Sequence, residues 1–204
     1  IVAPAIHYAE EGIPVAPRPP SPPGAVLRLG IWGKFSQYQT DHPSILVAAV
    51  AELAGEIPME IHHFGAVEAE TSLADNAARR GLAHVLHFHG HSEYEAGISL
   101  LAGMDVMVVS HRSPLMVGTK VYDAIRINRP ILAFCRPGDA LARLLRPFRY
   151  AFPVATAAEA AAAFREIVRL RPGCLDPGLD PEPYSRGSQA GKILPLLASL
   201  LGPR

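Results

Sequence analysis

The segment VGTKVYDAIRINRPILAF, residues 117–134, contains residue types that recognise phosphate. Val117 to Lys120 are predicted to form the first turn of a helix, whose free N–H groups and positive dipole end favour an anion. Gly118 and Thr119 place little side-chain bulk before such an anion. Lys120 could add a charge-assisted hydrogen bond worth about 1.5–3 kcal/mol. The helix dipole disfavours a lysine there by only about 0.3–1 kcal/mol, so Lys120 does not need an anion but fits one well.

Asp123 follows Thr119 by four residues and lies within the first two turns of this helix. A carboxylate at that place can accept two hydrogen bonds from vicinal hydroxyls, such as those of a ribose. The alternative is a surface acid that stabilises the positive end of the helix dipole. The residues alone leave both interpretations open.

A second glycine–lysine pair, Gly33 and Lys34, follows the first predicted strand. The glycine would let the backbone approach a phosphate, and the lysine could neutralise it; the alternative is a tight turn with a solvated lysine. The spacing in GIWGKF is not GxGxxG, and it is not that of a P-loop, so neither a dinucleotide nor a P-loop fingerprint is present. The loop carries no acidic residues of the kind a phosphorylated receiver domain needs.

Histidines cluster around the second and third predicted strands. His89 and His91 are expected to line a strand end next to a ligand, whereas His62, His63 and His87 are expected to be packed or capped locally. No HExxH or CxxC spacing supplies further metal ligands, so no metal is predicted. No Gly-x-Ser-x-Gly elbow is present either.

These candidates are positioned by an alternation of strands and helices. Strands are predicted at 25–32, 59–64, 84–90, 105–109, 131–134 and 150–155. Helices are predicted at 42–55, 71–81, 92–103, from 117 onward, at 138–145 and at 156–170, with capping boxes at Ser92/Glu95 and Thr156/Glu159. Six such units predict an α/β fold with a doubly wound, Rossmann-like, mostly parallel sheet of about six strands. Ligands of such sheets bind beyond the carboxyl ends of the strands, near the switch point.

Composition excludes several classes of function. The chain has 204 residues, 49% of them apolar, and its 19 basic and 19 acidic residues cancel. No global field therefore favours nucleic acid or an anionic membrane. No apolar run approaches the roughly 18 residues of a membrane span. The two cysteines form no CxxC pair, so a reducing cytoplasm is the expected location, with at most peripheral contact at the inner face of the membrane.

Three regions are expected along the chain. Residues 1–24 are an N-terminal segment and a proline-rich linker. Residues 25–170 form the ligand-binding domain. Residues 171–204 are expected to form a loop and an amphipathic helix, whose apolar surface would pack on an N-terminal domain that is missing from this chain or supplied by a partner.

Residues 27–170 resemble the C-terminal, donor-binding domain of GT-B-fold glycosyltransferases, especially family 4-like enzymes. Gly118, Asp123 and Pro130 hold the family's glycine, helix acid and strand-preceding proline. Gly90 and Asp105, in LHFHGHSEYEAGISLLAGMDVMVV, match a second family segment. LGIWGKF resembles the glycine loop after the domain's first strand.

The resemblance implies a nucleoside-diphosphate sugar as donor, a glycan or lipid as acceptor, and no metal or other cofactor. Gly33, Lys34, Gly118, Thr119 and Lys120 would bind the diphosphate, with Lys120 assisting catalysis. Asp123 would bind the ribose in place of the family's usual glutamate. The nucleobase would be bordered by His89, Gly90 and His91. His111 and Leu115 lie in the donor-sugar region.

Two departures from the family leave alternatives open. Leu115 stands where the family often has a glutamate facing the donor sugar. The N-terminal acceptor domain of the family has no counterpart in this chain, so the chain is expected to bind donor but to transfer sugar weakly or not at all. The alternatives are a non-hydrolysing nucleotide-sugar epimerase and a non-catalytic regulatory domain with a vestigial site.

Overall fold

The computed structural model describes residues 21–22, 24–67, 70–170, 178 and 180–201. Within them lies one six-stranded sheet with the order β3-β2-β1-β4-β5-β6, and every neighbouring pair is parallel. The strands are β1 Leu27–Trp32, β2 Met59–Phe64, β3 Leu86–Phe88, β4 Val106–Ser110, β5 Ile131–Phe134 and β6 Ala151–Val154. This confirms the predicted doubly wound fold, whose order reverses between β1 and β4.

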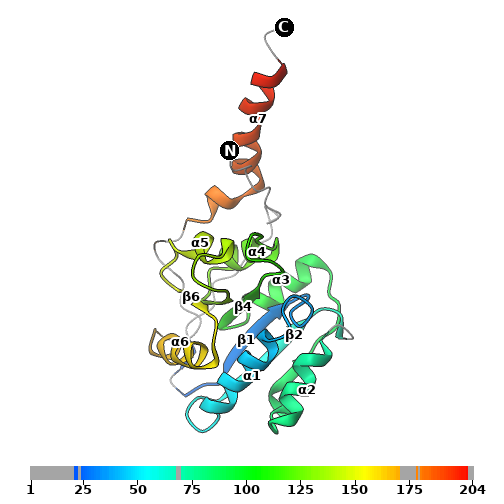
Figure 1. Ribbon diagram of the computed structural model, residues 1–204, viewed down its shortest axis with the longest axis vertical. Helices are drawn as coiled ribbons and strands as arrows, with labels where there is room; N and C mark the ends of the chain where they lie inside the picture. Colours follow the sequence, from blue (N-terminus) through cyan, green and yellow to red (C-terminus); the bar gives the residue numbers. More distant parts are fainter. Residues whose placement is uncertain (1–20, 23, 68–69, 171–177, 179, 202–204) are drawn as a thin grey trace.

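Helices cover both faces of the sheet (Figure 1). One layer packs on the larger apolar cluster and contains α1 His42–Leu53, α2 Thr71–Arg79 and α6 Ala157–Leu170. The other layer contains α3 Tyr94–Ala102, α4 Lys120–Ile127 and α5 Ala140–Leu145. The crossovers change face once, after β3, and the carboxyl ends of β1 and β4 lie open at this switch point.

The strand sequences explain their places in the sheet. Every residue of β4 and β5 is buried, as expected for the apolar central strands of a parallel sheet. β6 contains the exposed Pro153 and lies at an edge, where a proline removes no needed ladder bond. In β1 and β2 the apolar side chains alternate toward α1, so that Arg28 and Glu60 face the opposite side.

Five elements, β1, β3, α3, α4 and α5, begin two or more residues later than predicted. β3 is shorter than expected, because a 3-10 turn, η2 Ala83–Val85, precedes it. α3 begins at Tyr94 and Ser92 makes no cap, whereas the box of Thr156 and Glu159 at α6 is confirmed. α4 begins at Lys120 rather than at Val117.

The C-terminal part contains a short 3-10 turn, η3 Glu182–Tyr184, and then α7 Arg186–Leu201. Tyr184 packs its ring 5.5 Å from that of Phe148 and 6.4 Å from that of Tyr122, which ties η3 to the layer of α4 and α5. Beyond it α7 projects from the body (Figure 1) and contains Pro195 and several exposed leucines. Most of the predicted segment 1–24 and the loop from 171 lie outside the described residues. No described helix is long and apolar enough to cross a bilayer.

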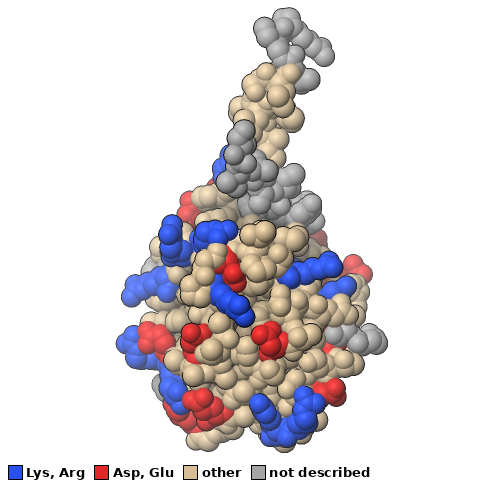
Figure 2. Space-filling view, in the orientation of Figure 1, with Lys and Arg blue, Asp and Glu red and all other residues tan. Residues whose placement is uncertain are grey.

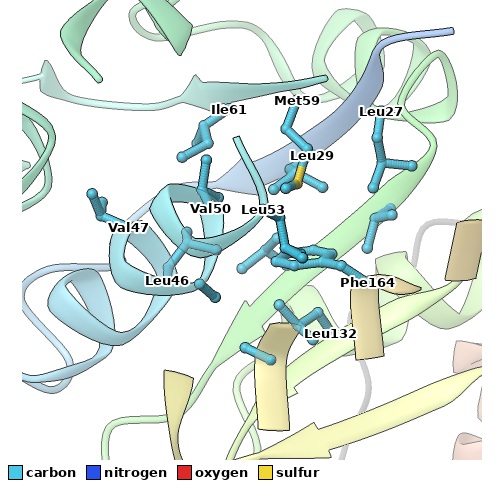
Figure 3. Packing of buried hydrophobic residues seen from close by; sticks show 14 of the residues in the cluster. Leu27, Leu29, Leu46, Val47, Val50, Leu53, Met59, Ile61, Leu132 and Phe164 are labelled. Carbon is cyan, nitrogen blue, oxygen red and sulfur yellow. The ribbon is translucent and has the colours of Figure 1, made fainter. Parts of the chain in front are cut away.

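Phe164 of α6 anchors the larger core cluster beside Leu53 and Leu132 (Figure 3). It is 0% exposed. Phe164→Ala is expected to lower the free energy of unfolding in urea by about 3–5 kcal/mol, through lost burial and the cavity left behind. Val168→Ala, on the same helix at 37% exposure, is the matched control and should cost about 1 kcal/mol or less. Equal losses in the two variants would contradict this packing.

Candidate functional site

Two adjoining pockets lie beyond the carboxyl ends of β1, β2 and β4, at the switch point of the sheet. Both are lined by Trp32, Lys34, Tyr38 and Lys120. The first also reaches Ser110, Gly118, Thr119 and Asp123. The second also reaches Gly33, Phe64, Gly65 and His91. The structure thus brings the two predicted glycine–lysine segments together at one crevice.

Lys120 is the first residue of α4, and its side chain lies across the end of β1. Its ammonium is 4.6 Å from the centroid of the Trp32 ring, which is cation–π distance. Desolvation lowers the pKa of Lys120 to about 8 and outweighs the attraction of Asp123. A partly desolvated ammonium beside a helix N-terminus is well placed to receive an anion.

The two glycines of the crevice, Gly33 and Gly118, differ in whether the fold requires glycine at their position. Gly33 has φ 76°, and a Cβ atom there would lie 2.8 Å from the Lys120 ammonium nitrogen, so the fold itself requires glycine. Gly118 has no positive φ, and a Cβ atom added to it would meet open space. Nothing in the fold therefore requires glycine at position 118.

A buried carboxylate holds the loop after β1. Glu70 is fully buried and accepts hydrogen bonds from the backbone N–H groups of Phe35 and Ser36, at 2.8 and 2.9 Å, and from the Ser36 hydroxyl at 2.6 Å. His63 donates from Nε2 to the Gly33 carbonyl at 2.6 Å, and burial lowers its pKa and keeps the ring neutral. Glu70 was not singled out in the sequence, because an acid just before a helix reads as a local cap rather than as a distant anchor. His63 was expected to be packed or capped locally, and it is fully buried.

Asp123 is buried and lines the first pocket. The Tyr94 hydroxyl donates to its Oδ1 at 2.5 Å, and the ring of Tyr94 packs 5.6 Å from that of Trp32. Tyr94 therefore fixes the orientation of the carboxylate toward the crevice. The role of Asp123 toward a ribose stays a prediction. The aromatic residues Trp32, Tyr38 and Tyr94 were not singled out in the sequence, where a lone ring after a strand gives no distinct signal.

The structure separates the predicted nucleobase residues. His91 lines the second pocket, and the Gly90 carbonyl accepts a hydrogen bond from Gly65 N–H at 2.8 Å. His89 is not among the described residues that line the two pockets. Its ring stacks instead on Phe64, at 4.5 Å, and on His62, at 5.2 Å. β3 ends at Phe88 and Gly90 has φ 74°, so the strand alternation that would keep His89 and His91 on one face does not continue to His91.

The two residues assigned to the donor-sugar region lie away from Lys120. Leu115 is 83% exposed on the loop before α4. His111 is buried, with Nε2 3.2 Å from an Asp139 carboxylate oxygen. His111 lines a separate pocket with Arg136, Asp139 and other residues beyond β5. Neither residue is among the described residues that line the crevice at Lys120.

No protein-family model and no curated protein matches the sequence. Solved structures do match. HepE from Anabaena, crystallised with UDP, superposes with a TM-score of 0.68 at 16% identity, over 85% of this chain and 49% of HepE. A glycosyltransferase from Rickettsia africae ESF-5 gives 0.68 at 13% identity, over 89% of this chain and 50% of its own. The chain has the fold of a GT-B C-terminal domain.

Further glycosyltransferases agree with this fold assignment. The pneumococcal O-GlcNAc transferase GtfA, crystallised with UDP and GlcNAc, gives a TM-score of 0.60 at 15% identity, over 87% of this chain and 36% of GtfA. This chain spans about half the length of the first two proteins. The resemblance read from the sequence motifs is thereby confirmed at the level of the fold.

Glu70→Ala is expected to destabilise the protein by about 3 kcal/mol or more, since it leaves three buried donors without their acceptor at about 1–3 kcal/mol each. Urea unfolding measures the loss. Glu93→Ala is the matched control, because Glu93 likewise precedes a helix without a side-chain cap bond but is exposed. A Glu70 variant as stable as the Glu93 variant would refute the anchoring role.

Proposed function

We propose that this chain binds the nucleotide-sugar donor of a glycosyltransferase that transfers the sugar to a glycan or lipid acceptor. The observation that carries the proposal is the Lys120 ammonium, which lies at the start of α4 and against Gly33 at the switch point. The matched structures with bound UDP support it, since their fold is the same.

The diphosphate would lie between the start of α4 and the loop of Gly33 and Lys34. Backbone N–H groups near Gly118 and Thr119 would bind its oxygens, and Lys120 would neutralise its charge. During transfer, negative charge develops on the departing diphosphate, so the same groups would stabilise the leaving group. Because helix and lysine supply this stabilisation, we propose that no metal takes part at the diphosphate.

The nucleoside would lie in the two pockets that adjoin at Lys120. Asp123, held by Tyr94, would accept hydrogen bonds from the ribose hydroxyls. Gly90 and His91 would border the base, because His91 lines the second pocket beside Trp32. His89 does not share that pocket, so we do not propose that it contacts the base.

The acceptor and part of the catalytic machinery would come from an N-terminal domain outside this chain, in a cytoplasmic protein with at most peripheral membrane contact.

An epimerase would need acid and base carboxylates, and Asp123 is the single carboxylate among the described residues lining the two pockets. A vestigial regulatory domain would bind no nucleotide, which makes binding the decisive measurement.

Calorimetric titration with UDP, GDP, ADP and their sugar conjugates is expected to show binding of at least one nucleoside diphosphate. Lys120→Ala should weaken it by about 10- to 150-fold, the loss of one charge-assisted hydrogen bond. Lys192→Ala, on the projecting helix α7, should leave the affinity unchanged. No binding of any nucleotide at millimolar concentration would refute the proposal.

The same titration should depend on pH in a defined direction. The pKa of Lys120 is about 8, so its ammonium is charged below that pH and neutral above it. Affinity is therefore expected to be highest below about pH 8 and to fall as the pH rises toward about 9.5. The Lys120→Ala variant should lose this dependence, and a variant that retains it would place the titrating group elsewhere.

Gly118→Val is expected to weaken nucleotide binding by about tenfold or more while changing thermal unfolding little, since a Cβ atom at position 118 meets only open space in the free protein. Gly55→Val is the matched control, because a Cβ atom there also meets open space, at the end of α1 and away from the crevice. A nucleotide affinity that survives Gly118→Val would place the diphosphate elsewhere.

A further inference from the structure

A cluster of metal-ligating side chains lies on the sheet outside the crevice. Glu60 and His62 are two apart on β2 and therefore share a face. His87 of β3 pairs directly with His62 in the parallel register. The three side chains stand on the face opposite α1, beside the edge strand β3, and each is half-buried.

Three potential ligand atoms lie close enough together to surround one metal ion. One ligand atom from each of Glu60, His62 and His87 lies within 4.8 Å of the others. His62 Nε2 is 3.1 Å from a Glu60 oxygen, and His87 Nε2 is 4.0 Å from the other oxygen of the same carboxylate. Ligands in a tetrahedral zinc shell, with bonds of about 2.0–2.2 Å, lie roughly 3.4 Å apart. Contraction by about 1 Å through side-chain rotation would bring the three atoms to this spacing, with a water molecule as the fourth ligand.

Two further contacts point to a bound cation. His87 Nε2 is buried and has no hydrogen-bond partner among the described residues, although it faces a carboxylate. His62 Nδ1 lies 2.9 Å from His89 Nε2, so His89 can accept the proton of Nδ1 and leave Nε2 of His62 free to ligate. Metal-ligating histidines ordinarily have such a partner on their other nitrogen.

We propose that Glu60, His62 and His87 form a zinc site that ties the short edge strand β3 to β2. Two imidazoles and a carboxylate favour a divalent transition metal over magnesium, which prefers oxygen ligands. The sequence spacing did not indicate this site, since the ligands come from two strands and become neighbours only through the register of the sheet. The site is independent of the proposed nucleotide crevice.

Arg28 is the competing charge at this site. It stands opposite Glu60 in the register of β1 and β2, with its Nε 3.5 Å from a Glu60 oxygen. Its positive charge opposes the binding of a second cation to the same carboxylate. Arg28→Gln is therefore expected to tighten zinc binding by a few-fold, and a variant that weakens it would contradict the proposed arrangement.

The test is calorimetric titration of the untagged, chelator-treated full chain with zinc chloride. One zinc per chain is expected, with micromolar or tighter affinity, and magnesium should not bind. His62→Ala and His87→Ala should each weaken zinc binding by about 100-fold, and His89→Ala by about tenfold. His84→Ala is the matched control, since exposed His84 lies in the turn before β3 and, among the residues that the structure describes, hydrogen-bonds the Gly81 carbonyl. Zinc affinity that survives His62→Ala and His87→Ala, or that depends equally on His84, would overturn the proposal.

Cobalt supplies a second readout, with circular dichroism as the check that each variant is folded. Visible absorption of the cobalt-loaded protein should show a low-coordinate site in the unaltered chain, and the bands should disappear in the His87→Ala variant at unchanged circular dichroism. UDP affinity is expected to be the same in the His87→Ala variant as in the unaltered chain. Loss of nucleotide binding alone would therefore leave the zinc site standing, and absence of the cobalt bands from the unaltered chain would refute it.

Discussion

The contact between Lys120 and Gly33 is the constraint on which the candidate site depends. A Cβ atom on Gly33 would stand 2.8 Å from the Lys120 ammonium and 3.1 Å from its Cε, so the lack of a side chain there lets the lysine take this position across the end of β1. The contact exists because β1 and β4 are neighbours, so that the loop after each strand opens at the same edge. The sheet order thus produces the crevice, and the glycine allows the cation into it.

Sequence predicted the parts of this arrangement that depend on local pattern. β2 and β5 have the predicted bounds, and β4 is buried throughout as its apolar run implied. The meeting of the two glycine–lysine segments also followed, because carboxyl ends of parallel strands share an edge. These inferences needed only the periodicity of side chains and the topology that it imposes.

The features of the site that the sequence did not predict depend on contacts between segments that are distant in the chain. Glu70 is 35 residues from the backbone N–H group that it binds at Phe35, and no local pattern pairs them. The packing of His89 against Phe64, rather than in the pocket with His91, depends on the exact register of β2 and β3. Orientation of Asp123 likewise depends on Tyr94, which approaches from another helix. Such pairings are set by tertiary packing and have no signal in spacing.

The charge distribution argues that any anion is recognised at short range. The chain has equal numbers of acidic and basic residues, and they are interspersed over the face shown in Figure 2. Long-range steering of a nucleotide is therefore weak, because opposite charges cancel beyond about 10 Å at 0.1 M salt. In the proposed site, selectivity would then rest on Lys120, whose charge is poorly solvated in the free protein and whose neighbours are a ring and a helix terminus. A cation in that position gains most from a diphosphate that comes into direct contact with it, which is why the glycines on either side matter as much as the charge.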